Sequence, residues 1–151
     1  VHNALDFIRR NYDMKDTDHI LIHDSARPFI TKEDIQKLND ALSIYDVVSL
    51  ATRTTDTIKY VEKEEEKDGV LYAKVEKTID RQKLWNMLTP QGFKYKVIKE
   101  AYDKFFATGT SQNITDDLQI IENFSDSSAY LIEGSKYNVK ITTNEDLKYL
   151  E

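Results

Sequence analysis

The chain has no cysteine and only four glycines among its 151 residues. The lack of cysteine excludes disulfides, thiol nucleophiles and thiolate metal sites. The three histidines do not have the spacing of a zinc site. The glycines stand far apart, so the chain contains no glycine-rich phosphate-binding loop. They occupy positions Gly69, Gly92, Gly109 and Gly134.

Long apolar runs and an excess of positive charge are also missing. No run approaches the length of a membrane span and no signal peptide is visible, so we expect a soluble, cytoplasmic protein with no membrane partner. The formal net charge is -6 and the pI is about 5.1, which argues against a nucleic-acid partner. The length suffices for one domain with a core.

The chain also lacks an initiator methionine. It begins Val1-His2-Asn3-Ala4, and Val1, Leu5 and Ile8 already recur at helical spacing. We therefore expect a helix over residues 1–12 and an N-terminally incomplete domain over residues 1–151.

The chemically informative stretch is His23-Asp24-Ser25-Ala26-Arg27-Pro28, directly after the apolar run Ile20-Leu21-Ile22. The apolar run predicts a buried parallel strand over residues 19–23, and open α/β sheets bind ligands at the carboxyl ends of such strands. Asp24 offers a carboxylate to a hydrated metal ion or a ribose hydroxyl, and Arg27 offers a planar fork to phosphate. The alternative is that the two side chains form a local ion pair or cap the next helix.

The next residues predict a βαβ unit. Thr31 and Asp34 resemble a capping arrangement, and the helix that they open runs to about Tyr45 with an apolar face. Residues 47–51 are a second buried strand, so we expect a parallel sheet with a right-handed crossover.

Residues 54–88 have a different pattern. Residues 54–61 and 70–75 alternate like half-exposed strands, and between them lies a charge run, residues 62–68, closed by Gly69. This pattern predicts a hairpin arm with a solvated tip, although the acidic run could instead be an interaction tail. Because an isolated hairpin is marginally stable in water, we expect a second subunit to cover the arm.

The remaining third of the chain predicts elements that return to the sheet. Residues 84–87 are expected to be extended, and a helix follows from Phe93 to about Gly109. Thr115 is the expected N-cap of the next helix. Strands are expected at residues 130–132 and 139–141, and Thr143 is expected to cap a last helix that reaches Leu150.

Four blocks, taken in order, resemble the signature set of the 2-C-methyl-D-erythritol 4-phosphate cytidylyltransferases. They are His23-Asp24-Ser25-Ala26-Arg27-Pro28, then Asp80-Arg81 with Leu84-Trp85 and Thr89-Pro90-Gln91, then Thr115-Asp116-Asp117, then Gly134 with Asn138-Val139-Lys140-Ile141-Thr142-Thr143. The related ribitol-5-phosphate cytidylyltransferases share much of this set. Ala26 resembles the methylerythritol branch, because the ribitol branch tends to carry valine there, whereas Ser25 departs from the usual alanine.

The resemblance implies an α/β fold of the nucleotidyltransferase, glycosyltransferase-A-like type, with a mostly parallel nucleotide-binding sheet flanked by helices and a projecting β-arm. It implies a homodimer that joins CTP and a sugar-alcohol phosphate with the help of Mg2+, giving a CDP-linked product and pyrophosphate. In the family a glycine-rich CTP loop precedes the strand that ends at Asp24. That loop is absent here, so we expect this chain alone to be inactive.

The resemblance also implies roles for individual residues. The expected catalytic residues are Lys140, Arg81 and Asp24, and Asp24 is also the expected metal ligand. The expected nucleotide-binding residues are Asp24, Ser25, Ala26, Arg27, Thr115 and Lys140. The substrate phosphate is expected to contact Thr57 and Arg81 of the arm, supplied by the partner subunit, and Thr89 is expected to line the same pocket.

The leading functional hypothesis is transfer of CMP from CTP to 2-C-methyl-D-erythritol 4-phosphate in isoprenoid precursor synthesis. One alternative is the same reaction on ribitol 5-phosphate for teichoic-acid or polysaccharide synthesis. A second is an inactive dimerisation fragment of such an enzyme. A glycosyltransferase with a related sheet is a further possibility, against which the lack of a DxD-like metal motif in a suitable loop argues.

Overall fold

The computed structural model describes residues 1–109 and 113–150, and the chain divides into two compact units. The first unit comprises residues 1–52 and 87–151, and the second comprises residues 53–86. The first contains a sheet of strand order β1-β5-β2-β6, and the second contains the hairpin β3-β4. The strands are β1 (His19–Ile22), β2 (Val47–Arg53), β3 (Lys59–Lys67), β4 (Val70–Thr78), β5 (Trp85–Lys94) and β6 (Ala129–Glu133).

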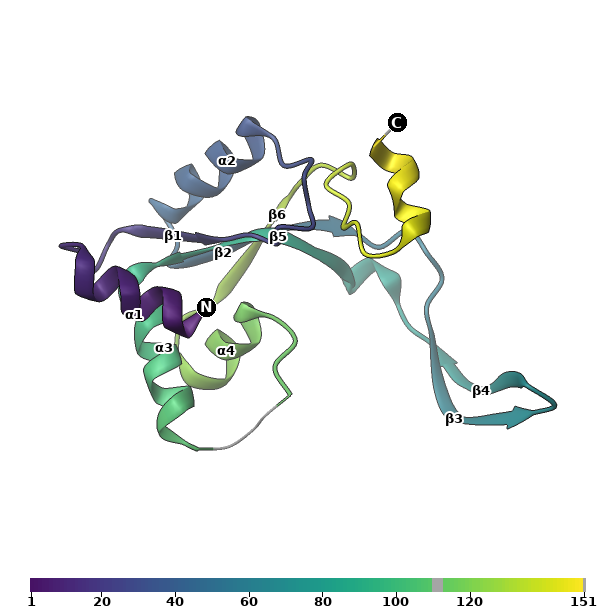
Figure 1. Ribbon diagram of the computed structural model, residues 1–151. Coiled ribbons are helices and arrows are strands. Elements are labelled where there is room, and N and C mark those ends of the chain that lie inside the picture. The colour runs from purple at the N-terminus through teal and green to yellow at the C-terminus, as the bar shows by residue number, and fades with distance from the viewer. Residues whose placement is uncertain (110–112, 151) are drawn as a thin grey trace. The chain divides into compact units, whose positions relative to one another are not determined.

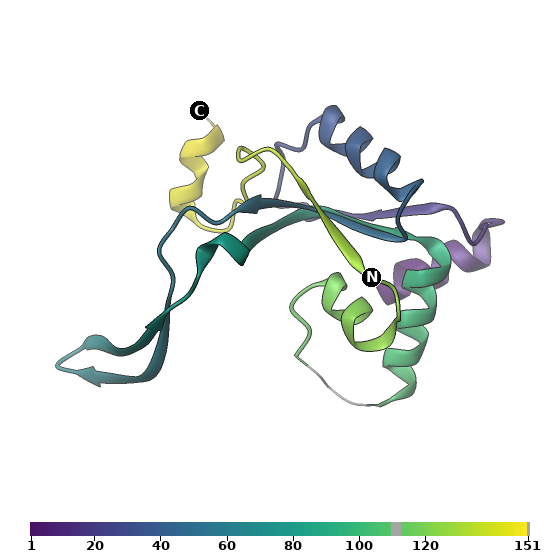
Figure 2. The ribbon, with the colours of Figure 1, turned by 180° about the vertical axis from the view of Figure 1, so that it is seen from behind.

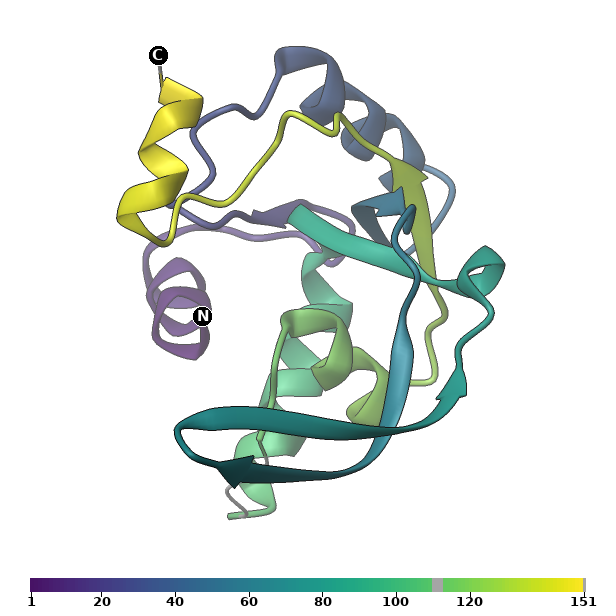
Figure 3. The same ribbon diagram turned by 90° about the vertical axis from the view of Figure 1, so that its right-hand side faces the viewer.

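Helices cover both faces of the four-stranded sheet (Figures 1 and 2). Helix α2 (Lys32–Leu42) lies on one face, and α1 (His2–Asn11), α3 (Tyr95–Ala107) and α4 (Asp117–Phe124) lie on the other. Figure 3 shows the same separation from the side. Two short 3-10 helices, η1 (Arg81–Lys83) and η2 (Asn144–Leu150), complete the described elements. No described helix has both the length and the apolar character needed to cross a membrane.

Strand β2 explains why the core has two layers. Successive side chains of a strand point to opposite faces, and residues 47–51 are all buried. Val47 packs in the cluster that contains the apolar residues of α3 and α4, while Val48 and Leu50 pack in the cluster that contains Leu38 and Leu42 of α2. A strand covered on both faces is apolar throughout, as the sequence predicted for residues 47–51.

The sheet is mixed, whereas the sequence predicted a mostly parallel one. Strand β2 pairs with β6 in parallel, but β5 lies between β1 and β2 and pairs antiparallel with β1. The antiparallel strand has a topological cause. Between β2 and β5 the chain contains only the hairpin and the three-residue η1, and no helix that could carry it back along the sheet, as a parallel return usually requires.

The predicted hairpin is confirmed, but its tip is shorter than expected. The charge run belongs to β3, and the turn consists of Asp68 and Gly69, whose φ angles are 52° and 75°. Two positive φ angles in a two-residue loop match the turns that suit the twist of a hairpin. Every residue of β3 and β4 is exposed, so the hairpin has no core of its own.

Two smaller predictions need correction. Helix α3 begins at Tyr95, because Gly92 and Phe93 still belong to β5. Residues 139–141 form no strand. The amide of Asn138 donates to the Ser135 carbonyl in a turn, and the Ile141 amide donates to the Ala26 carbonyl in the loop after β1, 2.8 Å.

The expected cap is confirmed at α2 and was placed one residue too early at α4. Thr31 caps α2, since its hydroxyl accepts from the Asp34 amide. Helix α4 is capped one residue later than expected, by Asp116, whose carboxylate accepts from the Gln119 amide. At η2, which begins directly after Thr143, the Asp146 carboxylate accepts hydrogen bonds from the amides of Thr142 and Thr143. These bonds lower the pKa of Asp146 to about 2.

Candidate active site

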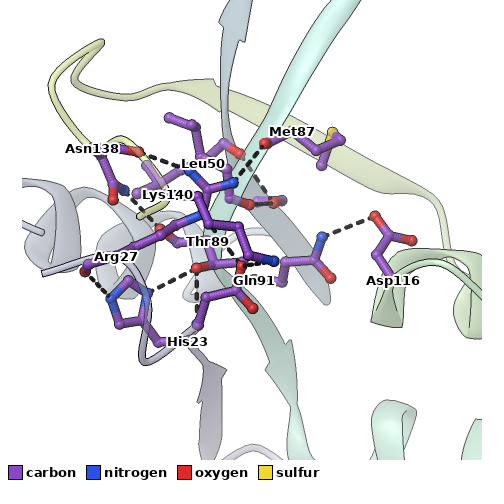
Figure 4. Close-up of polar contacts among 12 residues, drawn as sticks. His23, Arg27, Leu50, Met87, Thr89, Gln91, Asp116, Asn138 and Lys140 are labelled. Atoms are coloured by element: carbon purple, nitrogen blue, oxygen red, sulfur yellow. Dashed lines mark hydrogen bonds and ion pairs between the residues drawn. The ribbon is translucent and has the colours of Figure 1, made fainter. Parts of the chain in front are cut away.

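A polar cavity of about 240 Å3 opens in the first unit. Its lining comes from the residues after β1, from β5, from the start of α4 and from the segment after β6 (Figure 4). The lining residues are Ile22, Asp24, Arg27, Met87, Leu88, Thr89, Gln91, Thr115, Asp116, Asp117 and Lys140. The structure thus brings five of the predicted site residues into one cavity, namely Asp24, Arg27, Thr89, Thr115 and Lys140.

Asp24 is the electrostatic centre of this cavity. Its Oδ2 lies 3.1 Å from the Lys140 Nζ and 3.3 Å from the Arg27 Nε. Burial raises the pKa of Asp24, but the hydrogen bonds and charges of Lys140 and then Arg27 outweigh burial and hold this pKa below its usual range. Asp24 is therefore an ionised carboxylate at neutral pH.

The Arg27 side chain is held by hydrogen bonds to three segments of the chain. Besides its bond to Asp24, its Nη1 donates to the Asn138 carbonyl at 2.8 Å and its Nη2 donates to the Met87 carbonyl at 3.5 Å. Its side chain is only 12% exposed, against 46% for Lys140. Lys140 is thus the more accessible cation of the cavity, and Arg27 joins three segments. The local ion pair between Asp24 and Arg27, which the sequence offered as an alternative, is present, but it is one of several contacts that Arg27 makes.

His23 and Thr89 link the loop after β1 to β5. The Thr89 Oγ1 accepts from the Asp24 amide at 3.0 Å and lies 2.9 Å from the His23 Nδ1. The other ring nitrogen of His23, Nε2, lies 2.9 Å from the Arg27 carbonyl. The Asn138 Nδ2 donates to the Thr89 carbonyl at 2.7 Å, so the same point on β5 also holds the segment after β6.

The other end of the cavity is acidic. Asp116 accepts from the Gln91 Nε2 at 3.0 Å, and the Gln91 Oε1 accepts from the Leu118 amide, so Gln91 joins β5 to α4. Asp117 accepts a hydrogen bond from the Tyr102 hydroxyl. Burial raises the pKa of Asp117 in spite of this bond, and burial together with Asp117 raises the pKa of Tyr102.

The remaining predicted residues lie elsewhere in the chain. Thr57 and Arg81 belong to the second unit, where the Arg81 Nη1 donates to the Thr55 carbonyl. Ser25 and Ala26 are in the loop after β1, and they do not line the cavity among the described residues. The roles proposed for these four residues stay predictions.

Sequence reasoning missed several residues of this network. Gln91, Asp116, Asp117 and Asn138 all lie within the quoted motifs, but no role was assigned to them. A polar side chain inside a motif was the available signal. Tyr102 could not be found in this way, because on the sequence it is one of several aromatic residues of an amphipathic helix.

Comparison with known proteins identifies the family. The family model of the 2-C-methyl-D-erythritol 4-phosphate cytidylyltransferases (IspD) matches residues 1–151. The chain belongs to this family. The resemblance inferred from the four sequence blocks is thereby confirmed.

Individual members of the cytidylyltransferase family agree with this assignment. The curated 2-C-methyl-D-erythritol 4-phosphate cytidylyltransferase of Pseudoalteromonas translucida is 40% identical over 148 residues, which cover 97% of this chain and 54% of the relative. That of Bacillus pumilus is 37% identical over 134 residues, which cover 89% of this chain and 54% of the relative. The chain thus spans about half the length of these relatives.

Solved cytidylyltransferase structures share the fold. The crystal structure of the Francisella tularensis enzyme matches with a TM-score of 0.79 at 28% identity, covering 99% of this chain and 64% of that one. The 4-diphosphocytidyl-2C-methyl-D-erythritol synthase of Anaerococcus prevotii matches with a TM-score of 0.76 at 31% identity, covering 97% and 62%. The α/β nucleotidyltransferase fold predicted from the sequence is confirmed.

Proposed function

We propose that the complete protein transfers CMP from CTP to 2-C-methyl-D-erythritol 4-phosphate and releases pyrophosphate. The observation that carries this proposal is the cavity in which Lys140 and Arg27 meet the carboxylate of Asp24, in a chain that belongs to the cytidylyltransferase family. The choice of substrate rests on the names of the relatives, and the cavity contains two cationic side chains, Lys140 and Arg27, that suit a phosphate.

The reaction is limited by charge. An oxygen of the acceptor phosphate attacks the α-phosphorus of CTP, a new P–O bond forms, and the bond to the bridging oxygen breaks so that pyrophosphate leaves. Two anions must meet, and negative charge develops on the oxygens around the α-phosphorus. We assign this neutralising role to Lys140, because nearly half of its side chain is exposed and its Nζ lies at the cavity, 3.1 Å from the Asp24 Oδ2.

Asp24 is the residue that fits Mg2+. This ion is usually bound by one or two carboxylates together with substrate phosphates and water, so a dedicated protein cage is not needed. The described residues contain no cluster of three or more side chains that could hold a metal ion, which matches a site of this shared kind. When bound, Mg2+ would supply further positive charge to the phosphates of CTP.

The proposal includes the assembly. We propose that the enzyme is a homodimer and that the arm of one subunit, with Thr57 and Arg81, completes the acceptor site of the other. A guanidinium suits a phosphate monoester because it can bind two of its oxygens at once.

The experiment is a pyrophosphate-release assay on the protein at its full natural length. CTP with 2-C-methyl-D-erythritol 4-phosphate should give turnover, and Lys140→Met should lower kcat by about 100-fold, the usual cost of losing one charge-stabilising group. Lys136→Met is the matched control, because Lys136 lies in the same segment, carries the same charge and does not line the cavity. It should leave turnover unchanged.

Two outcomes would overturn this assignment. Faster turnover with ribitol 5-phosphate than with the methylerythritol substrate would mean that the acceptor is wrong. No turnover with either acceptor at full length, in a protein that is folded and dimeric, would leave the inactive dimerisation protein as the better explanation.

A further inference from the structure

The base of the arm, residues 53–57 and 80–86, is closed by contacts between its two segments, and all of it belongs to the second unit. The Thr54 amide donates to the Leu84 carbonyl at 3.2 Å, and the Thr54 hydroxyl donates to the Asn86 Oδ1 at 3.1 Å. Thr54 is only 7% exposed, so water competes little for these bonds. The closure places the end of β2 beside the start of β5.

Next to this closure, the guanidinium of Arg53 lies over the ring of Trp85. The Arg53 Cζ is 5.2 Å from the ring centroid, which is a cation–π contact. No hydrogen bond joins the Arg53 side chain to another described residue, so its five N–H donors remain available. Trp85 therefore restricts the side chain of Arg53 without using its donors.

The Arg81 side chain is held close to the same place. Its Nη1 donates to the Thr55 carbonyl, and Thr55 comes two residues after Arg53, about 7 Å along an extended chain. Arg53, Thr55 and Arg81 are all exposed, whereas Thr54 is buried. The two guanidinium groups thus belong to the exposed side of the arm base.

Neither arginine forms an ion pair with a carboxylate among the described residues. The neighbouring Asp80 uses its carboxylate to accept from the Gln82 amide. A shortage of acids is not the reason, because the chain has 27 acidic and 21 basic side chains. Two lysines of the hairpin do have carboxylate partners, in the pairs Lys67–Glu65 at 2.9 Å and Lys74–Glu62 at 2.5 Å. The arm base therefore holds two guanidinium groups that can bind an anion from outside the chain.

We propose that Arg53 is a second guanidinium of the acceptor site, that Trp85 holds it in place, and that Arg53 and Arg81 together bind the acceptor phosphate. This inference rests on the proposed function for the identity of the anion. A phosphate monoester carries about two negative charges at neutral pH, so two guanidinium groups match its charge. A side chain already restricted by the ring loses less conformational freedom when the phosphate binds.

The direct test is binding of inorganic phosphate to the full-length protein, followed through the indole 15N–1H signal of Trp85. Comparison with Trp85→Phe assigns this signal. Phosphate should shift it with saturation, whereas sodium chloride at the same ionic strength should not. In Arg53→Met the shift should disappear or should need about tenfold more phosphate.

This readout does not require turnover, so it tests the two arginines even if the proposed reaction is wrong. The proposal is overturned if the Trp85 signal does not respond to phosphate, or if it shifts equally in Arg53→Met.

Steady-state kinetics of the full-length protein test the consequence for the acceptor. Arg53→Met should raise the KM for the acceptor about tenfold, with little change in kcat or in the KM for CTP, because a binding contact is lost. Trp85→Leu keeps the arginine but removes the ring, and should raise the acceptor KM about threefold. Trp85→Phe keeps an aromatic face and should stay close to wild type.

Arg10→Met is the matched control. It makes the same change at an exposed arginine of α1, in the first unit, and should behave as wild type. If Arg53→Met lowers the stability in urea but leaves the acceptor KM unchanged, the contact with Trp85 only stabilises the arm and the proposal is wrong.

Discussion

Lys140 lowers the pKa of Asp24, and this effect can be measured. Because Lys140 is the largest cause that lowers the pKa of Asp24, Lys140→Met should raise this pKa toward the ordinary value for aspartate. A depressed pKa contributes stability above the unfolded-state pKa and loses it as the pH falls through the folded-state value. The part of the stability loss on acidification that comes from Asp24 should therefore become smaller in Lys140→Met.

The measurement is an NMR titration of the Asp24 carboxyl carbon in wild type and Lys140→Met. Lys136→Met again serves as the control, and its titration midpoint should match that of wild type. An equal midpoint in Lys140→Met would show that the ion pair seen at 3.1 Å does not persist in solution.

Tyr102 and Asp117 form the second residue pair with a testable energy. Tyr102→Phe leaves a partly buried carboxylate without its donor, which should destabilise the protein by about 1–3 kcal/mol at neutral pH. The folded-state pKa of Asp117 is raised, so the stability linked to it is present at low pH and is lost as the pH rises through that value. Urea unfolding should thus show a smaller cost of Tyr102→Phe at acid pH, below the raised pKa of Asp117, than at neutral pH, and an equal cost at both pH values would contradict this account.

At the scale of elements, the turn of the hairpin depends on one glycine. Gly69 has a φ of 75°, which a β-branched residue adopts only with strain, so Gly69→Val should weaken the hairpin by ~1–2 kcal/mol. Amide hydrogen exchange in β3 and β4 should become about five- to thirtyfold faster. Asp68→Asn is the control, since asparagine tolerates the positive φ of 52° at that position. Unchanged exchange in Gly69→Val would mean that the turn has another conformation.

The elements show which parts of the fold the sequence could predict. Strand β2 and helix α2 were predicted well, because an apolar run and a Thr31 cap act within a few residues. The antiparallel direction of β5 was not predicted, because the direction of a strand depends on where the chain re-enters the sheet after the hairpin and not on the residues of β5. The cap at Asp116 was assigned one residue early, since Thr115 and Asp116 are both good caps and only the backbone geometry distinguishes them.

The candidate site was also predicted only in part. Asp24, Arg27, Thr89 and Lys140 come from segments far apart in the chain, and only the family resemblance grouped them before the structure did. Their individual hydrogen bonds could not be predicted. The contact between the Thr89 Oγ1 and the His23 Nδ1, for example, depends on how β5 lies beside the loop after β1, which no motif specifies.

At the scale of the whole molecule, the exposed apolar side chains of the hairpin predict that it is covered by a second subunit. Its strands expose apolar side chains, among them Leu71 (64% exposed) and Val75 (52%), and an isolated two-stranded hairpin is marginally stable. Changing both residues to lysine should convert the proposed dimer to a monomer in sedimentation velocity. Ile44→Lys changes an apolar residue outside the hairpin that is even more exposed (74%), and this variant should stay dimeric. A dimer that survives the Leu71→Lys and Val75→Lys changes would mean that the hairpin does not form the interface.

The same assembly makes a sharper prediction about the active site. Suppose that each site takes Lys140 from one subunit and Arg81 from its partner. A homodimer of Lys140→Met, or of Arg81→Met, then has two defective sites. A mixed dimer of the two variants has one intact site and one site in which both residues are altered. Random exchange of subunits in an equal mixture gives half mixed dimers, so turnover should recover to about a quarter of the wild-type value. Subunits that carry both residues of a site in one chain would show no recovery, and Thr57 and Arg81 would then act within their own subunit. Recovery therefore distinguishes a shared site from a dimer that serves stability alone.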